Sequence, residues 1–298
     1  MIVGRCWSLW WPNRSDDHPA VIVGGMQSVR LIEQWPVDNA ATAVVRADGT
    51  VLGSHGDLDR GFALASVTKL LTAYATLVAI EEGVVALDDA AGPPGSTVRH
   101  LLAHTSGLAF DEHKVVAEPG RRRLYSNAGF LELADILGKR SQIPFADYVR
   151  EAVLDPLSMR STPFESAAAG ASSSVADLAR FAAELQAPTL VDAATMTHAT
   201  TVAFPGVTGI LPGFGHQKPN DWGLGFEIRD GKDPHWTGAT NSPKTFGHFG
   251  GAGTYLWVDP ALGAACIALT DRPFGPWAAE VWPPFSDAVV AEVRGSVS

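Results

Sequence analysis

The stretch Ala65-Ser66-Val67-Thr68-Lys69 opens a long apolar run that continues to residue 82 and is followed by Gly83. The run is rich in Ala and Leu on all sides, which predicts a largely buried helix over residues 66–82 that ends at the glycine. Residues three positions apart on a helix lie on the same face, about one turn from each other. The Ser66 hydroxyl and the Lys69 amine are therefore a candidate nucleophile and base.

A plainer interpretation of this pair is an ordinary helix N-cap serine followed by a solvated lysine. The helix dipole argues against it, because acidic residues are favoured in a first turn and lysine in a last one. A serine hydroxyl is a poor nucleophile at neutral pH unless a neighbour takes its proton. Lys69 could do so if burial or nearby positive charge keeps its amine partly deprotonated.

Two further short motifs follow downstream. The first is Tyr125-Ser126-Asn127, in which the phenol is a possible second proton relay, and the Asn127 amide could hold both the lysine and a substrate carbonyl. The second is His248-Phe249-Gly250, inside a strand-like stretch. Taken singly each motif is weak, but their order and surroundings together describe one active site.

With these three motifs the chain resembles the serine β-lactamase and penicillin-binding-protein superfamily, specifically its class C-like branch. That branch has Tyr-x-Asn as its second motif, and its third motif, usually Lys-Thr-Gly, occurs in several branches as His-x-Gly. The likeness runs from about residue 40 to about residue 272. It also includes the stretch from Val98 to Leu108, Pro119-Gly120, Pro156-Leu157 with Met159, and the stretch from Gly223 to Phe226.

The resemblance implies an α+β fold of the β-lactamase/transpeptidase type, in which an antiparallel sheet is flanked by helices and carries an inserted, mostly helical lobe. It implies a serine hydrolase that needs neither a metal nor an organic cofactor. The expected catalytic residues are Ser66, Lys69 and Tyr125. The expected substrate-binding and oxyanion residues are Asn127, His248, Gly250 and Gly251, with the backbone N–H groups of Ser66 and Gly251 as the oxyanion donors.

Residues 26–298 are expected to form one catalytic domain, preceded by a poorly ordered N-terminal extension over residues 1–25. Within it, residues 38–65 and 222–298 should form the sheet and residues 66–221 the helical lobe. Strands are expected over 40–46 and 50–54, around the turn Asp48-Gly49, and over 222–229, 245–258 and 263–270. The final helix is expected over 285–294, and residues 186–221 are expected to be loops.

Composition excludes several classes of function. A net charge of −10 without a basic stripe argues against nucleic-acid binding. No apolar stretch is long enough to span a bilayer, and the first residues do not have the pattern of a signal peptide, so we expect a cytoplasmic protein. Cys6 and Cys266 are far apart, and Cys266 is expected to be a buried thiol.

Other titratable residues receive plainer interpretations. His100 and His104 have the i, i+4 spacing of zinc ligands but lack a third ligand, so a structural role is favoured. The basic run from Arg121 to Arg123 is expected to be a solvated loop. His216 and His235 are expected on surface loops.

The third motif bears on the substrate, which we expect to be a small ester or amide. In β-lactam-binding relatives the threonine hydroxyl and the cation of this motif hold the substrate carboxylate. Here Phe249 replaces the threonine, and His248 carries at most part of a positive charge near neutral pH. The sequence therefore favours a carboxylesterase. The alternatives are a β-lactamase or a D-amino-acid or D-Ala-D-Ala peptidase and, less favoured, a non-catalytic binding relative.

Overall fold

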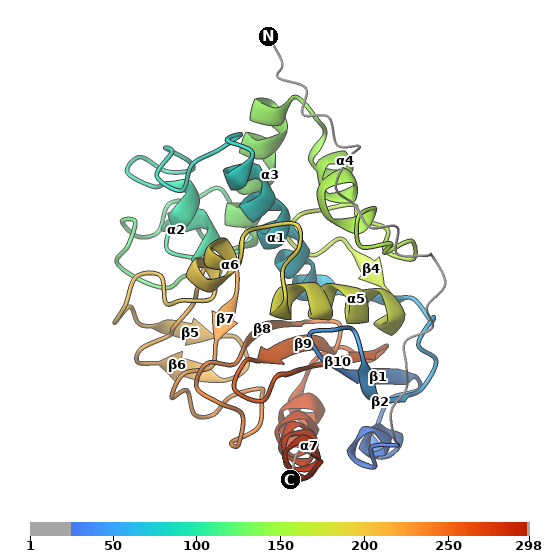
Figure 1. Ribbon diagram of the computed structural model, residues 1–298. Helices are drawn as coiled ribbons and strands as arrows, with labels where there is room; N and C mark the ends of the chain where they lie inside the picture. The colour runs from blue at the N-terminus through green and yellow to red at the C-terminus, as the bar shows by residue number, and fades with distance from the viewer. Residues whose placement is uncertain (1–24, 297–298) are drawn as a thin grey trace.

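Residues 25–296 are described by a computed structural model, which has a six-stranded antiparallel sheet at its centre (Figure 1). The strand order is β2-β1-β10-β9-β8-β7, so the sheet is assembled from both ends of the chain, as the resemblance implies. Its strands are β1 (Ala40–Val45), β2 (Val51–His55), β7 (Glu227–Ile228), β8 (Phe246–Gly250), β9 (Thr254–Asp259) and β10 (Ala264–Thr270). The expected α+β fold is confirmed.

The segment between β2 and β7 is mostly helical. Its helices are α1 (Thr68–Glu81), α2 (Val98–Leu102), α3 (Asn127–Ser141), α4 (Phe145–Val149), which continues as the π-helical η3 (Arg150–Leu154), α5 (Val175–Gln186) and α6 (Ala193–Ala199). Two short 3-10 segments, η1 (Ser28–Gln34) and η2 (Ala65–Val67), precede this lobe, and α7 (Pro276–Gly295) follows the sheet. Two small two-stranded sheets pair β3 (Phe62–Ala63) with β4 (Ser172–Ser173) and β5 (Gly209–Leu211) with β6 (Gly215–Gln217).

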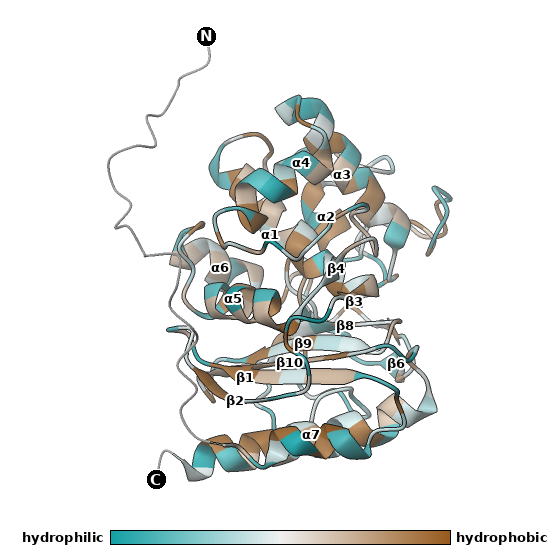
Figure 2. Cartoon of the chain, turned by 90° about the vertical axis from the view of Figure 1, so that its right-hand side faces the viewer, coloured by the Kyte–Doolittle hydropathy of each residue, from teal (hydrophilic) through white to brown (hydrophobic). Residues whose placement is uncertain are grey.

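The sheet separates two hydrophobic cores, with α7 on one face and the helical lobe on the other (Figure 2). Alternate residues of a strand point to opposite faces, and the central strands are buried on both. Leu256 and Ile267 thus belong to the core under the helical lobe, whereas Trp257 and Cys266 belong to the core against α7. Cys266 is a buried free thiol, as expected, whereas Cys6 lies outside the described residues.

The single strand expected over residues 245–258 is instead two strands, β8 and β9, which pair antiparallel across a turn at residues 251–253. Two expected boundaries are also wrong, each for a tertiary reason. Helix α7 begins at Pro276, well before residue 285, and contains Pro283 and Pro284, which favour a break in isolation. Trp282 and Phe285, on either side of these prolines, are buried in the core and stabilise the helix. The strand expected from residue 222 is reduced to β7, because the chain takes a positive φ of 89° at Gly225 to pass the side chain of Ala73 on α1.

Two other elements lie close to where the sequence predicts them. The hairpin of β1 and β2 lies where the Asp48-Gly49 turn predicts it, and α1 lies within the predicted run of residues 66–82. Residues 186–221, expected to be loops, also contain α6, β5 and β6, so that expectation is wrong for these elements. Between residues 25 and 296, no helix combines the length and hydrophobicity that a membrane crossing needs. Residues 1–24 of the expected N-terminal extension lie outside the described part of the chain.

Candidate active site

Ser66 lies in the 3-10 turn η2, two residues before α1 begins at Thr68. Ala65 is in the left-handed region with a φ of 45°, which turns the chain sharply into the helix. The turn is fixed from two sides, because the Leu64 carbonyl accepts hydrogen bonds from the Val67 N–H (3.1 Å) and from the Thr254 hydroxyl of β9 (2.9 Å). The Ser66 side chain is therefore presented at the junction of sheet and helical lobe.

Lys69 is fully buried one turn further along, and its Nζ lies 3.4 Å from the Ser66 Oγ. The same nitrogen donates to the Asn127 Oδ1 (2.6 Å) and to the Ala168 carbonyl (2.7 Å). Burial lowers the pKa of Lys69 to about 7, although the negative charge of Asp111 partly opposes this. A large fraction of this amine is consequently neutral at neutral pH, as a base for Ser66 requires.

Tyr125 and Asn127 lie at the start of α3, where Ser126 is the N-cap. The Ser126 hydroxyl accepts from the Gly129 N–H (3.0 Å) and donates to the Ala109 carbonyl (2.6 Å), which fixes the residues on either side of it. Burial raises the pKa of Tyr125 above its ordinary value, and a contact with the Ser66 hydroxyl partly opposes the shift. The phenol is therefore protonated near neutral pH.

His248 lies on β8 and is buried, with its Nε2 3.2 Å from the Tyr125 hydroxyl. Its Nδ1 is 2.6 Å from the Phe249 carbonyl oxygen, which can only accept, so Nδ1 carries the proton. Nε2 is then an acceptor for the tyrosine O–H. Burial and the nearby Lys69 lower the pKa of His248 to about 3, which makes it a neutral member of the site.

Gly250 ends β8 beside the Ser66 turn, and Gly251 follows it in the turn to β9. A Cβ at Gly250 would lie 2.2 Å from the Leu64 carbonyl oxygen and 3.2 Å from the Ser66 nitrogen, so only glycine allows this close approach. A Cβ at Gly251 would meet nothing within 4 Å, and its carbonyl accepts from the Phe274 N–H at 2.9 Å. The structure thus brings all seven expected site residues to one junction, and their roles remain predictions.

Phe249 alternates with His248 and points to the opposite face of the sheet. Its ring packs in the core against α7, with ring centroids 4.9 Å from Phe274 and 6.0 Å from Trp282. The position lacks a hydroxyl, as the sequence indicates. Its side chain nevertheless packs in this core, so a change to threonine would create a cavity there as well as add a hydrogen-bond donor.

His104 and His100 take structural positions. His104 is buried, its Nδ1 accepts from the Ser126 N–H (3.1 Å), and its ring lies 4.5 Å from the Tyr125 ring, centroid to centroid. The Nδ1 of His100 contacts the Thr97 hydroxyl at 2.9 Å. In the part of the chain that is described, no three His, Cys, Asp or Glu side chains are grouped to hold a metal ion.

The expectation of a solvated basic run is wrong for Arg123, whereas Arg121 and Arg122 are exposed as expected. The Arg123 side chain is buried and donates to the carbonyls of Ala103, Ala203 (3.0 Å) and Asn220 (2.9 Å). Three loops are thus joined two residues before Tyr125. Because arginine keeps its charge and has five donors, it can satisfy several buried carbonyls at once.

Asp111 is a neighbour of the site that the sequence did not reveal. It lies on the exposed loop between α2 and α3, and its Oδ1 accepts from the Asn127 Nδ2 at 2.7 Å. No periodicity or motif marks this position, since the contact depends on how the loop folds back onto α3.

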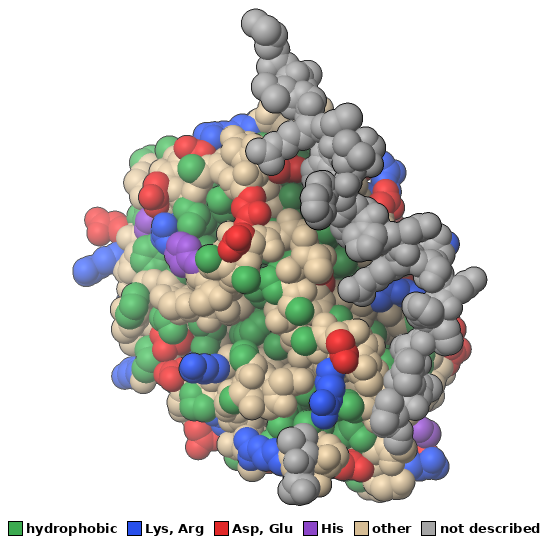
Figure 3. Space-filling view, in the orientation of Figure 1, with side chains coloured by type: hydrophobic (Ala, Val, Ile, Leu, Met, Phe, Trp, Pro, Cys, Tyr) green, Lys and Arg blue, Asp and Glu red, His purple; other side chains and the backbone are tan. Residues whose placement is uncertain are grey.

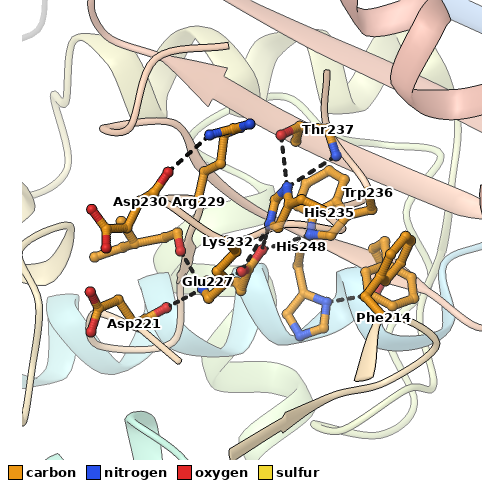
Figure 4. Close-up of polar contacts among 12 residues, drawn as sticks. Phe214, Asp221, Glu227, Arg229, Asp230, Lys232, His235, Trp236, Thr237 and His248 are labelled. Atoms are coloured by element: carbon orange, nitrogen blue, oxygen red, sulfur yellow. Dashed lines mark hydrogen bonds and ion pairs between the residues drawn. The ribbon is translucent and has the colours of Figure 1, made fainter. Parts of the chain in front are cut away.

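A second buried polar cluster lies at β7 (Figure 4). The Glu227 carboxylate accepts from Lys232, from the His235 Nε2 (3.0 Å) and from the Trp236 Nε1 (2.6 Å). Burial by itself would raise the pKa of Glu227, but His235 and Lys232 hold it below its ordinary value. His235 is therefore a core residue and not a surface one, whereas His216 is exposed as expected.

With the fold and this geometry established, comparison with known proteins identifies the family. A family model described as Beta-lactamase matches residues 31–291. The chain belongs to the Beta-lactamase family. Proteins of this family are serine hydrolases that act on ester or amide bonds, and the superfamily expected from the three motifs is confirmed.

Individual relatives agree with this assignment. A solved structure of a beta-lactamase from Mycobacterium bovis is 56% identical, with a TM-score of 0.88 over 89% of this chain and 99% of that one. Penicillin-binding protein 4* of Bacillus subtilis is 31% identical over 34% of this chain and 30% of its own length. The D-alanyl-D-alanine-carboxypeptidase/endopeptidase AmpH of Escherichia coli is 26% identical over 42% and 44%. The chain thus matches less than half the length of these two curated relatives.

Proposed function

We propose that this Beta-lactamase family member is a carboxylesterase that works through an acyl-Ser66 intermediate. The observation that carries the proposal is the buried Lys69 amine, with a pKa of about 7 and its Nζ 3.4 Å from the Ser66 Oγ. A neutral amine has two hydrogens and one lone pair. The two hydrogens suffice for Asn127 and Ala168, which leaves the lone pair for the serine proton.

In the first step the Ser66 Oγ attacks the ester carbonyl carbon, and its proton passes to the Lys69 Nζ. The carbonyl oxygen becomes an oxyanion, for which the backbone N–H groups of Ser66 and Gly251 are the proposed donors. Collapse of this intermediate breaks the bond to the alcohol oxygen, which leaves as the alcohol after taking a proton. Water then attacks the acyl-Ser66 ester by the same route and releases the acid.

Tyr125 is proposed to deliver the proton to the leaving alcohol. Burial keeps its phenol protonated, which suits an acid or a relay better than a permanent base. Its O–H donates to the His248 Nε2, so the histidine orients the phenol without carrying charge. Lys69 becomes an ammonium when it takes the serine proton, and it can return that proton through Tyr125.

An ester is favoured over an anionic substrate because the third motif offers no cation. The neutral imidazole of His248 cannot attract a carboxylate, and the Phe249 side chain lies in the core on the other face of the sheet. The second candidate is a β-lactamase or D-Ala-D-Ala peptidase, which the names of the relatives favour. These substrates carry a carboxylate for which the motif lacks the usual lysine and threonine.

A fluorophosphonate probe together with a panel of p-nitrophenyl esters tests the proposal, with Ser66→Ala as the control. We expect labelling at Ser66 and turnover of the esters at a higher kcat/KM than nitrocefin. Nitrocefin turnover that exceeds ester turnover would favour the β-lactamase candidate. Failure of the probe to label a folded protein would instead favour a non-catalytic relative.

A further inference from the structure

The Asp111 carboxylate fixes the orientation of the Asn127 amide. An amide has an accepting oxygen and a donating nitrogen that can exchange places by a flip of the side chain. The Asn127 Nδ2 donates to the Asp111 Oδ1 at 2.7 Å, and a carboxylate in this place can only accept. The Asn127 Oδ1 is therefore directed to the Lys69 Nζ, 2.6 Å away.

Asp111 also sets the charge of the site. The titratable groups around Lys69 are Tyr125 before α3, His104 after α2, His248 on β8 and Asp111 itself. The two histidines are neutral because burial lowers the pKa of each, and the phenol is protonated. Asp111 is the carboxylate among these described residues, and its negative charge acts on both Lys69 and Tyr125.

Other charged side chains lie around Asp111. Glu112, His113 and Lys114 follow it on the same loop, and the buried Arg123, which donates to three backbone carbonyls, keeps its positive charge. On the face seen in Figure 3, acidic and basic side chains are interspersed, so no continuous patch of one sign dominates. Asp111 differs from these groups because it contacts Asn127 directly and its charge acts on Lys69 and Tyr125.

The exposed loop that bears Asp111 carries the charged or titratable residues Glu112, His113 and Lys114, and it also exposes apolar side chains. Phe110, Val115 and Val116 are each 52% exposed, and the Phe110 ring lies 5.9 Å from the Tyr125 ring, centroid to centroid. Ile210 on β5 is 64% exposed, and its neighbour Gly209 bridges to Arg123 on the other side of the motif. Exposed apolar side chains on both sides of Tyr125 suit an apolar substrate group.

We infer that Asp111 is a specificity-determining residue, which disfavours substrates with a carboxylate near the reacting carbonyl and leaves uncharged apolar esters as the preferred class. The inference rests on the proposed esterase function and adds to it a residue that selects among substrates. The Asp111 carboxylate repels a substrate carboxylate, and this repulsion adds to the absence of a cation in the third motif that would bind one.

Two p-nitrophenyl esters of similar length test the inference, the neutral butyrate and the anionic half-ester of glutarate. Asp111→Asn removes the charge but keeps an oxygen that can accept from Asn127. Glu112→Gln is the matched control, because this neighbouring carboxylate makes no contact with the three motifs in the described structure. For each variant the ratio of kcat/KM for the anionic ester to that for the neutral one is measured at low and high salt.

We expect Asp111→Asn to raise this ratio about three- to tenfold at low ionic strength, as unit charges several Å apart near a protein surface interact with that strength. The gain should shrink at 1 M salt, where screening acts over about 3 Å. Glu112→Gln should leave the ratio unchanged. The acid limb of the pH profile should move to lower pH in Asp111→Asn only, because removal of the negative charge lowers the pKa of Lys69 further.

An unchanged ratio in Asp111→Asn, or an equal change in Glu112→Gln, would overturn the inference. A parent protein that prefers the anionic ester would overturn it as well, while leaving the esterase function intact. A parent that is labelled by fluorophosphonate yet hydrolyses neither ester would overturn the esterase function itself. Asp111→Ala, which also releases the Asn127 amide, should lower kcat for the neutral ester more than Asp111→Asn does.

Discussion

Two lysines of this protein are almost completely buried, and they are buried in different ways. Lys69 is fully buried and contacts an amide oxygen, a backbone carbonyl and a hydroxyl, with no carboxylate in direct contact. Lys232 is 3% exposed and forms an ion pair with the equally buried Glu227. Burial lowers the pKa of both, but Glu227 opposes the shift at Lys232.

The difference shows that burial alone does not make a lysine a base. An ammonium taken out of water keeps its proton when a carboxylate balances it and gives it up when only neutral groups surround it. Lys232 therefore suits a structural role, in which it joins β7 to the following loop through Glu227, the Asp221 carbonyl (2.6 Å) and the Ile228 carbonyl. Lys69 suits the transfer of a proton.

The largest loss of activity should follow from removal of the Ser66 hydroxyl. This hydroxyl lies beside Lys69 and has no counterpart beside Lys232. Ser66→Ala should abolish ester hydrolysis, by on the order of a million-fold where chemistry limits the rate, because the covalent nucleophile is lost. The fold should persist, since Ser66 is partly exposed at its turn. The measurement is kcat/KM for a p-nitrophenyl ester together with a melting curve. Activity within tenfold of the parent would remove Ser66 from the mechanism.

The comparison itself is tested by changing each lysine to methionine. Lys69→Met should lower kcat/KM by about 10²- to 10⁴-fold, as expected for loss of a general base, without lowering stability. Lys232→Met should instead destabilise the fold by roughly 3–5 kcal/mol, because Glu227 stays buried without its lysine.

Denaturant unfolding and ester kinetics on both variants separate the two roles, and Lys232→Met with Glu227→Gln is the control for the unpaired charge. That double variant should recover part of the lost stability. Similar losses of activity and of stability in both single variants would mean that the two lysines do not differ as proposed.

The proton relay is tested by a double-mutant cycle of Lys69→Ala and Tyr125→Phe. Each change should be severe, and the double variant should lose much less than the product of the two losses, because groups that move one proton act as a unit. The quantity to compare is the coupling in kcat/KM for one neutral ester. Fully multiplicative losses would show that the phenol and the amine act independently.

A smaller effect concerns the dependence of stability on pH. The folded pKa of Lys69 is about 7 against an ordinary value of 10.5, so between these values the unfolded chain binds more protons than the folded one. Stability should therefore rise with pH across this window, by on the order of a few kcal/mol from Lys69 alone. The difference in unfolding free energy between the parent and Lys69→Met, followed from pH 7 to pH 10, isolates this contribution. A constant difference would contradict the lowered pKa.

The sequence predicted the fold and the centre of the site because both are encoded locally. Ser66 and Lys69 are one helical turn apart, Tyr125 and Asn127 flank a helix N-cap, and the strand that bears His248 is apolar on both sides. Such short motifs, in a fixed order along the chain, can be recognised without knowledge of the tertiary structure.

The sequence did not predict the residues whose roles arise from contacts between loops. The sequence predicts a solvated Arg123, whereas the side chain binds carbonyls that lie 20, 80 and 97 positions away. It predicts His235 on the surface, whereas His235 pairs with Glu227 across a loop. Asp111 carries no motif, and it meets Asn127 only because its loop folds onto α3. Loops lack the hydrophobic periodicity from which such burial could be predicted.

The most direct test of the central claim is the pH dependence of Ser66 acylation, measured in a single turnover with a neutral p-nitrophenyl ester. If Lys69 is the neutral base, the acylation rate should rise with pH and level off with an apparent pKa near 7. A rate that is independent of pH, or one that rises only near pH 10.5 as for an ordinary lysine, would contradict the account.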